Sequence, residues 1–99
     1  MMQIRLLEIA QIELDDSIDY YNSESVGLGD EFLVEVLLTL DRINNFPQAW
    51  HPFTDVTRRC QLRRFPYGII YQTLDAEILV IAVANLHRNP EFWKDRIKE

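Results

Sequence analysis

The segment from Arg58 to Arg64 contains four arginines, and a proline-glycine turn and an apolar stretch follow it. Guanidinium groups donate paired N–H hydrogen bonds to carboxylates and phosphates. Polar and apolar side chains alternate along the segment, so a strand here would place Arg59 and Arg63 on one basic face and Arg64 on the other, over the helices. In a chain of net charge -6, we expect an anionic partner to bind this basic face.

Three further side chains are candidates for the same site. Arg88 is expected just beyond the end of the neighbouring central strand, close to Arg59 and Arg63. An unperturbed imidazole titrates at about pH 6.5, so His87 is a candidate proton carrier, with a hydrogen-bonded structural histidine as the alternative. Trp93 is a candidate partner contact, with anchoring of the tail against the body as the alternative. Each arginine has the alternative of being solvated or paired with a carboxylate of the same molecule.

Composition restricts the class of protein. With 99 residues, of which 47% are hydrophobic and 26% charged, the chain is expected to form a single domain, residues 1–99, around one core. Cys60 is the only cysteine and there are two histidines, so we expect no disulfide, no metal site and no cofactor. The sequence lacks a signal-peptide pattern and any run of about 18 apolar residues, which predicts a cytoplasmic protein without a membrane segment.

Acidic and basic residues are unevenly distributed along the chain. Residues 1–57 have a net charge of -9, and residues 58–99 have a net charge of +3. A local basic region in an acidic protein is compatible with a site for an anion or an acidic peptide. The acidic total argues against coating of nucleic acid, and no direct sequence-specific DNA binding is expected.

Hydrophobic periodicity predicts an α+β domain. Spacings of three and four residues indicate amphipathic helices at residues 8–22 and 30–45. The buried face of the second helix is expected to comprise Leu33, Val36, Leu37, Leu40 and either Ile43 or Asn44. Strands are predicted at residues 3–7, 58–64, 69–74 and 78–84, the last as a central strand buried on both faces. A loop is predicted at residues 46–55 and a short C-terminal helix at residues 91–98.

Three segments occur in an order that is specific for one family. They are Gly27 to Leu33, Arg58 to Tyr71, and Ile78 to Ala84 followed by His87 to Trp93. Together they resemble the RelE/ParE superfamily, the small toxins of type II toxin-antitoxin operons, and in particular its ParE-like, plasmid-stabilisation branch. The resemblance implies the order β-α-α-β-β-β, with a helical hairpin packed on a small, mostly antiparallel twisted sheet and a short C-terminal helix.

The resemblance also implies a function. A ParE-like toxin would form a heterocomplex with its cognate antitoxin, whose acidic or amphipathic segment neutralises it, and DNA gyrase would be the cellular target. In this interpretation the residues that bind the partner are Arg59, Arg63, Arg88 and Trp93. Such a protein would be an interaction toxin rather than a catalyst.

Two alternatives remain open at the level of sequence. A RelE-like member would be a ribosome-dependent messenger-RNA endonuclease, in which Arg63 and Arg88 stabilise charge and His87 acts as general acid or base. Gly68 stands where RNA-cleaving members commonly have a phosphate-contacting arginine, which weakens this alternative. The second alternative is a non-toxic relic that only binds the antitoxin.

Overall fold

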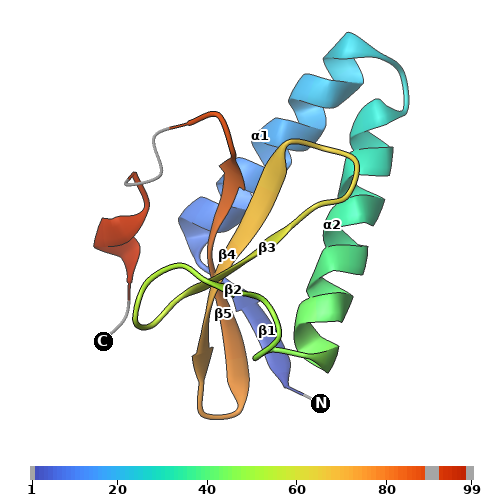
Figure 1. Ribbon diagram of the computed structural model, residues 1–99. Helices are drawn as coiled ribbons and strands as arrows, with labels where there is room; N and C mark the ends of the chain where they lie inside the picture. Colours follow the sequence, from blue (N-terminus) through green and yellow to red (C-terminus); the bar gives the residue numbers. More distant parts are fainter. Residues whose placement is uncertain (1, 89–91, 98–99) are drawn as a thin grey trace.

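The chain folds into two layers, a helical hairpin and a mixed five-stranded sheet (Figure 1). The computed structural model describes residues 2–88 and 92–97. In chain order the elements are β1 (Gln3–Leu6), α1 (Glu8–Glu24), α2 (Leu28–Asn45), β2 (His51–Pro52), β3 (Arg58–Gln61), β4 (Tyr67–Leu74), β5 (Glu77–Asn85) and the 3-10 helix η1 (Lys94–Arg96). The strand order is β1-β5-β4-β3-β2, with β1 parallel to β5 and all other neighbours antiparallel. The predicted α+β architecture is confirmed.

The helical hairpin is tighter than predicted. Because α1 ends two residues later and α2 begins two residues earlier than expected, only residues 25–27 connect the helices. Gly29 lies where the helices touch, and a Cβ at this position would overlap the carbonyl oxygen of Ile18. The backbone N–H of Gly29 donates a 2.7 Å hydrogen bond to Oδ1 of Asn22, which satisfies one N–H group of the first turn of α2.

The face of α2 that packs on the sheet differs from the predicted one. Val36 and Ile43 are buried as expected, but Leu37 is 55% exposed, so its predicted place in the core was wrong. Phe32 and Thr39 are fully buried instead. Apolar residues occur around much of α2, so their spacing alone does not predict which face is buried. The buried face is the one on which Phe32 packs among the aromatic rings of the core.

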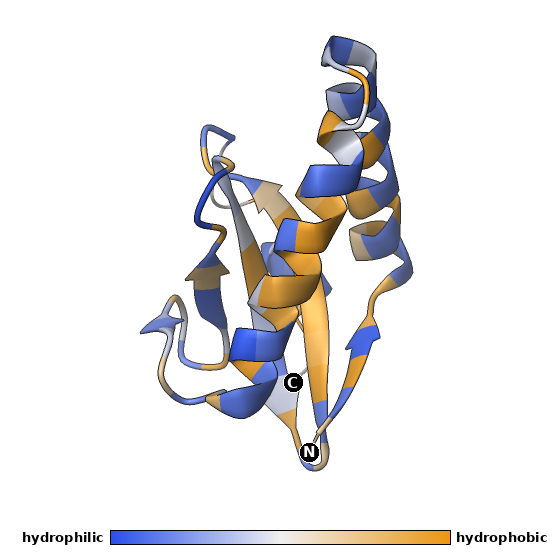
Figure 2. Ribbon diagram, turned by 90° about the vertical axis from the view of Figure 1, so that its right-hand side faces the viewer, coloured by the Kyte–Doolittle hydropathy of each residue, from blue (hydrophilic) through white to orange (hydrophobic). Residues whose placement is uncertain are grey.

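The sheet is buried on both faces, but unequally. The core between helices and sheet includes Ala10, Leu14, Phe32, Val36, Ile43, Cys60, Ile69, Tyr71 and Val80. A smaller core on the opposite face contains Ile70, Leu79, Ile81, Ala82, Ala84 and Trp93. Residues Ile78 to Ala84 of β5 are at most 6% exposed, which confirms the prediction of a central strand buried on both faces. Figure 2 shows the hydrophobic residues concentrated in the central strands and in the part of the helices beside them.

Strand β3 is shorter than predicted, and this changes the place of Arg63. The strand ends at Gln61, and the backbone N–H of Leu62 closes a turn by donating to the carbonyl of Tyr67 at 2.9 Å. Strand β4 therefore begins at Tyr67 rather than at residue 69. The backbone N–H of Arg63 donates to Oε1 of Glu35 on α2 at 2.7 Å. The prediction that Arg63 lies on the polar face of this strand was wrong, because a helix side chain rather than a strand binds its backbone.

Two short elements differ from the predicted loop and tail helix. Residues 51–52 form the edge strand β2, which pairs with the start of β3. Pro52 has no N–H to donate, which suits an edge position. The predicted C-terminal helix is reduced to the single 3-10 turn Lys94–Arg96, and residues 91 and 98, its predicted ends, lie outside the described residues. In the part of the chain that the structure describes, no helix has the length and apolar character needed to span a bilayer.

Candidate functional site

Arg59 lies on the face of the sheet that the helices do not cover. In the register of β3 with β4, it stands opposite Ile70, a member of the smaller core. Its Cζ atom lies 4.9 Å from the centre of the Phe53 ring, a cation-π distance. Its Nε atom is buried and has no hydrogen-bond partner in the described part of the molecule. The side chain is thus held by packing and ring contact, and none of the carboxylates in residues 2–88 and 92–97 forms an ion pair with it.

Gly68 makes room for the stem of Arg59. A Cβ at position 68 would lie 3.2 Å from Cγ and 3.3 Å from Cδ of Arg59, and 3.4 Å from Cδ2 of Leu86. The two residues are on neighbouring strands, and the arginine stem crosses over the glycine. The stem of Arg59 therefore lies within contact distance of the position that a Cβ atom at residue 68 would take.

Arg88 follows strand β5 and lies near Arg59. Its Cζ atom is 4.0 Å from the centre of the Phe92 ring. The two arginines line one small pocket together with Phe53, Phe92 and other apolar side chains. The structure thus brings Arg59 and Arg88 together, as predicted from the position of Arg88 after the central strand.

Arg63 belongs to a second, open hollow. This hollow has a volume of about 440 Å³ and is lined by Arg63 and Arg59, together with Arg42, Trp50 and His51. Arg59 therefore lies between the two hollows, with Arg88 on one side and Arg63 on the other.

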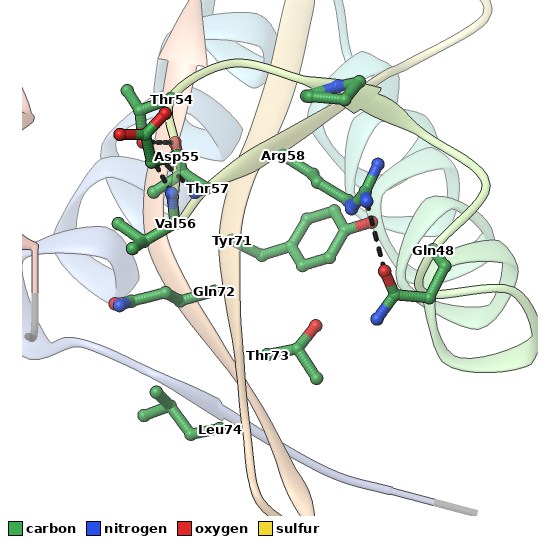
Figure 3. Close-up of a pocket in the computed structure, with 11 residues that line it drawn as sticks. Gln48, Thr54, Asp55, Val56, Thr57, Arg58, Tyr71, Gln72, Thr73 and Leu74 are labelled. Carbon is green, nitrogen blue, oxygen red and sulfur yellow. Dashed lines mark hydrogen bonds between the residues drawn. The ribbon is translucent and has the colours of Figure 1, made fainter.

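The other two arginines of the basic segment have structural partners. Arg58 donates to the carbonyl oxygen of Trp50 at 2.7 Å and to Oε1 of Gln48 at 3.1 Å. Figure 3 shows its guanidinium directed at Gln48, at the edge of a separate hollow of about 440 Å³. Arg64 forms a 2.9 Å ion pair with Glu31 of α2, so its predicted orientation toward the helices is confirmed. Among the described residues, Arg64 is the one arginine of this segment with a carboxylate within ion-pair distance, and no hydrogen bond engages the guanidinium groups of Arg59 and Arg63.

The remaining candidate residues have different surroundings. Trp93 is 1% exposed and packs on Phe53, with ring centres 5.1 Å apart. This burial agrees with the alternative expectation that Trp93 anchors the tail against the body, and its role as a partner contact stays a prediction. The side chain of His87 is exposed, and its backbone N–H donates to Oδ1 of Asn85 at 2.9 Å. Burial raises the pKa of the Cys60 thiol, although Arg42 opposes the shift, so the thiol is a weak nucleophile.

The arrangement can hold anions more readily than it can cleave a bond. Arg59, Arg63 and Arg88 present guanidinium groups for carboxylate or phosphate oxygens. The groups proposed for RNA cleavage are not gathered around one point, because Arg63 and Arg88 line different hollows and His87 faces solvent. In residues 2–88 and 92–97, no three His, Cys, Asp or Glu side chains lie close enough to share a metal ion.

Sequence reasoning missed the aromatic rings beneath the two neighbouring arginines. Phe92 follows Arg88 by four residues, a spacing that could have suggested the contact. Phe53 has no such local signal for Arg59. Its ring reaches the arginine because residues 51–52 pair with the start of β3, and this pairing was not predicted.

Comparison with known proteins agrees with this architecture. A family model described as the ParE toxin of the type II toxin-antitoxin system parDE matches residues 4–90. A solved structure described as the chromosomal ParDE TA system from P. aeruginosa superposes with a TM-score of 0.78 at 17% sequence identity, covering 87% of this chain and 97% of that chain. At this identity the likeness shows the fold. A search of curated proteins found no match.

Proposed function

Since the chain belongs to the ParE toxin family of type II toxin-antitoxin systems, we propose that it inhibits DNA gyrase and that an antitoxin neutralises it. In this proposal an acidic segment of the antitoxin binds the open face of the sheet at Arg59 and Arg88 and extends to Arg63 in the hollow beside it. The family match supports the toxin role. The resemblance to ParE-type toxins supports gyrase as the target.

The observation that carries the proposed partner site is the unpaired state of these three arginines. The chain has sixteen Asp and Glu residues, and elsewhere they do pair with arginines, as in Arg64 with Glu31 and Arg96 with Glu13. Arg59, Arg63 and Arg88 have no carboxylate within ion-pair distance among the described residues. Cations left unpaired in an acidic protein are available for the carboxylates of a partner, and complementary charge both steers and orients such an encounter.

A supercoiling assay tests the target. Purified protein should inhibit ATP-dependent supercoiling of relaxed plasmid by gyrase, and the antitoxin should restore it. Normal supercoiling at saturating protein would contradict the gyrase assignment.

Growth arrest on induction without antitoxin is expected, and its absence would contradict the toxic role. New 5′ ends within translated messenger RNA after induction would instead support an endoribonuclease.

Two adjacent arginines provide a matched test of the partner site. Arg63 is exposed and its guanidinium has no carboxylate partner in the described part of the chain, whereas Arg64 is paired with Glu31 on the helix side. Arg59→Gln and Arg63→Gln should each weaken antitoxin binding about tenfold, the effect of losing one charge-assisted hydrogen bond. Arg64→Gln should leave binding nearly unchanged. The antitoxin would be taken from the adjacent reading frame, and affinity measured by calorimetry. Equal effects of Arg63→Gln and Arg64→Gln would contradict the proposed site.

A further inference from the structure

Along one edge of the C-terminal half of strand β5, side chains make the backbone hydrogen bonds that a neighbouring strand would otherwise make. Strand β1 pairs with β5 only as far as Val80. Beyond it, the backbone N–H of Val83 donates to Oε1 of Glu13 at 3.1 Å. The carbonyl oxygen of Ile81 accepts from Nη1 of Arg96 at 3.2 Å. One carboxylate and one guanidinium thus satisfy a strand edge that would otherwise be unpaired.

The same two side chains bind each other. Nη1 of Arg96 donates to Oε1 of Glu13 at 2.9 Å, and Nη2 donates to Oε2 at 3.0 Å. Each side chain is only 14% exposed. The ion pair is bidentate, nearly buried and hydrogen-bonded to the backbone, so removing one partner would leave the other charge uncompensated.

This ion pair holds the C-terminal turn that supports the candidate site. The Cζ atom of Arg96 lies 5.2 Å from the centre of the Phe92 ring, and that of Arg88 lies 4.0 Å from it. Both guanidinium groups therefore contact one ring. The next residue, Trp93, packs on Phe53, which in turn contacts Arg59. The rings beneath both binding arginines depend on the placement of this turn.

We propose that Glu13 and Arg96 are positioning residues for the partner site, acting through the C-terminal turn on Arg88 and Arg59. The inference rests on the proposed function, in which these arginines bind partner carboxylates. The polarity of the pair is fixed by the strand edge: position 13 must supply an acceptor for the N–H of Val83, and position 96 must supply a donor for the carbonyl of Ile81. Exchange of the two charges would restore the ion pair but not these backbone hydrogen bonds.

The test uses the full chain with octaglutamate peptide as the probe, and two readouts. The first is peptide affinity by calorimetry. The second is the upfield ring-current shift of the Arg88 side-chain protons in the NMR spectrum, which reports contact with Phe92 and needs no ligand. Arg96→Gln should abolish the shift and weaken peptide binding about two- to fivefold, the loss expected for one cation-π contact. Arg96→Lys keeps a charged donor and should retain part of both.

Two further variants sharpen the test. The double variant Glu13→Arg with Arg96→Glu should not recover either readout. Asp16→Asn is the matched control, because Asp16 is an exposed carboxylate of α1 that lines the same hollow as Glu13 and Arg88. It removes one carboxylate charge, as Glu13→Gln would, without touching the strand edge, and the shift should persist.

The outcomes separate this inference from the proposed function. If the wild-type chain binds the peptide and Arg96→Gln changes neither readout, the positioning role is overturned while the binding face stands. Recovery of both readouts in the charge-exchanged variant would overturn the requirement for an acceptor at position 13 and a donor at position 96. A wild-type chain that does not bind octaglutamate would overturn the proposed anion-binding face, and the positioning role with it. Should Arg96→Gln fail to fold, Arg96→Lys and Glu13→Gln replace it. A reduced shift and a reduced affinity in both variants would support the role, and wild-type values of both readouts in Glu13→Gln would overturn it.

Discussion

The two faces of the sheet are covered to different extents. One face packs against α1 and α2, which together contribute residues 8–24 and 28–45, and it holds the larger core. The other face is covered by residues around Phe53 and by the C-terminal turn, and its core is smaller. Buried apolar area is the main source of folding free energy. We therefore expect the helix-covered face to determine stability and the open face to determine binding.

Charge follows the same division. Residues 8–45, which include both helices, contain ten of the sixteen acidic residues. Arg59, Arg63 and Arg88, which have no carboxylate partner among the described residues, lie on or beside the open face. An acidic segment would thus be repelled by the helical layer and attracted to the opposite side. The difference shows how an acidic protein can bind an acidic partner.

The largest effect is expected at the centre of the helix-covered face. Phe32 is fully buried and contacts the rings of Tyr21, Phe65 and Tyr67. Phe32→Ala should lower the free energy of unfolding by about 3–5 kcal/mol, measured by urea denaturation. Phe46→Ala, at a 64% exposed aromatic residue, is the control and should change it by about 0.5 kcal/mol or less. A loss below about 1 kcal/mol for Phe32→Ala would contradict the dominance of this face.

A smaller loss is expected at the centre of the open face. Trp93→Ala removes a larger buried ring, but Trp93 lies in the smaller core and next to a short terminal turn, so we expect this turn to detach before the rest of the chain unfolds. We expect a loss of about 3 kcal/mol or less, together with weaker binding of an acidic peptide, whereas Phe32→Ala should leave the affinity of the folded fraction unchanged. If Trp93→Ala destabilises the protein more than Phe32→Ala, the two faces do not differ as described.

Tyr71 gives the helix-covered face a pH dependence. Its hydroxyl donates a 2.6 Å hydrogen bond to the carbonyl of Pro47, and burial raises its pKa from 10.0 to about 12. The unfolded tyrosine therefore ionises first as the pH rises, so this contribution to stability is complete below pH 10 and is lost between pH 10 and 12. Tyr71→Phe should lower the free energy of unfolding by about 1 kcal/mol at neutral pH. It should also remove the part of the stability loss above pH 10 that comes from ionisation of Tyr71.

Denaturation curves at pH 8, 10 and 11 would measure the effect of Tyr71. Tyr20→Phe is the comparison for an exposed tyrosine, because Tyr20 is 55% exposed and the Glu24 carboxylate, rather than burial, is the main cause that raises its pKa. An unchanged alkaline slope in Tyr71→Phe would show that another group controls stability in this range.

The smallest effect on stability is expected at Gly68. The added methyl group of Gly68→Ala would press on the stem of Arg59, which must move by a few tenths of an ångström. We expect a change of about 1 kcal/mol or less in the free energy of unfolding and a larger relative effect on peptide affinity. The same substitution in an Arg59→Ala background should be nearly neutral for affinity. Additive effects in this double-mutant cycle would exclude coupling between the two residues.

Much of the fold could be predicted from the sequence, because its elements have strong local patterns. The uninterrupted apolar run from Ile78 to Ala84 predicted the central strand, and the structure confirms it. The buried face of α2 was predicted incorrectly, since apolar residues such as Leu37 and Leu38 also occur on its exposed side. The end of β3 was also missed, because the carboxylate of Glu35 that binds the backbone of Arg63 is 28 residues away in the chain.

The sequence by itself determined the order of the two helices and of four of the five strands, and the separation of acidic from basic residues, because periodicity and composition are local properties. Only the tertiary structure decided which arginines remain available to bind the carboxylates of a partner. Arg58 and Arg64 have partners 10 and 33 residues away, and Arg96 binds Glu13 across 83 residues. Arg59 instead stacks on a ring. Adjacent, chemically identical side chains differ in role because packing brings a hydrogen-bond acceptor to the guanidinium groups of Arg58 and Arg64 and, among the described residues, none to those of Arg59 and Arg63.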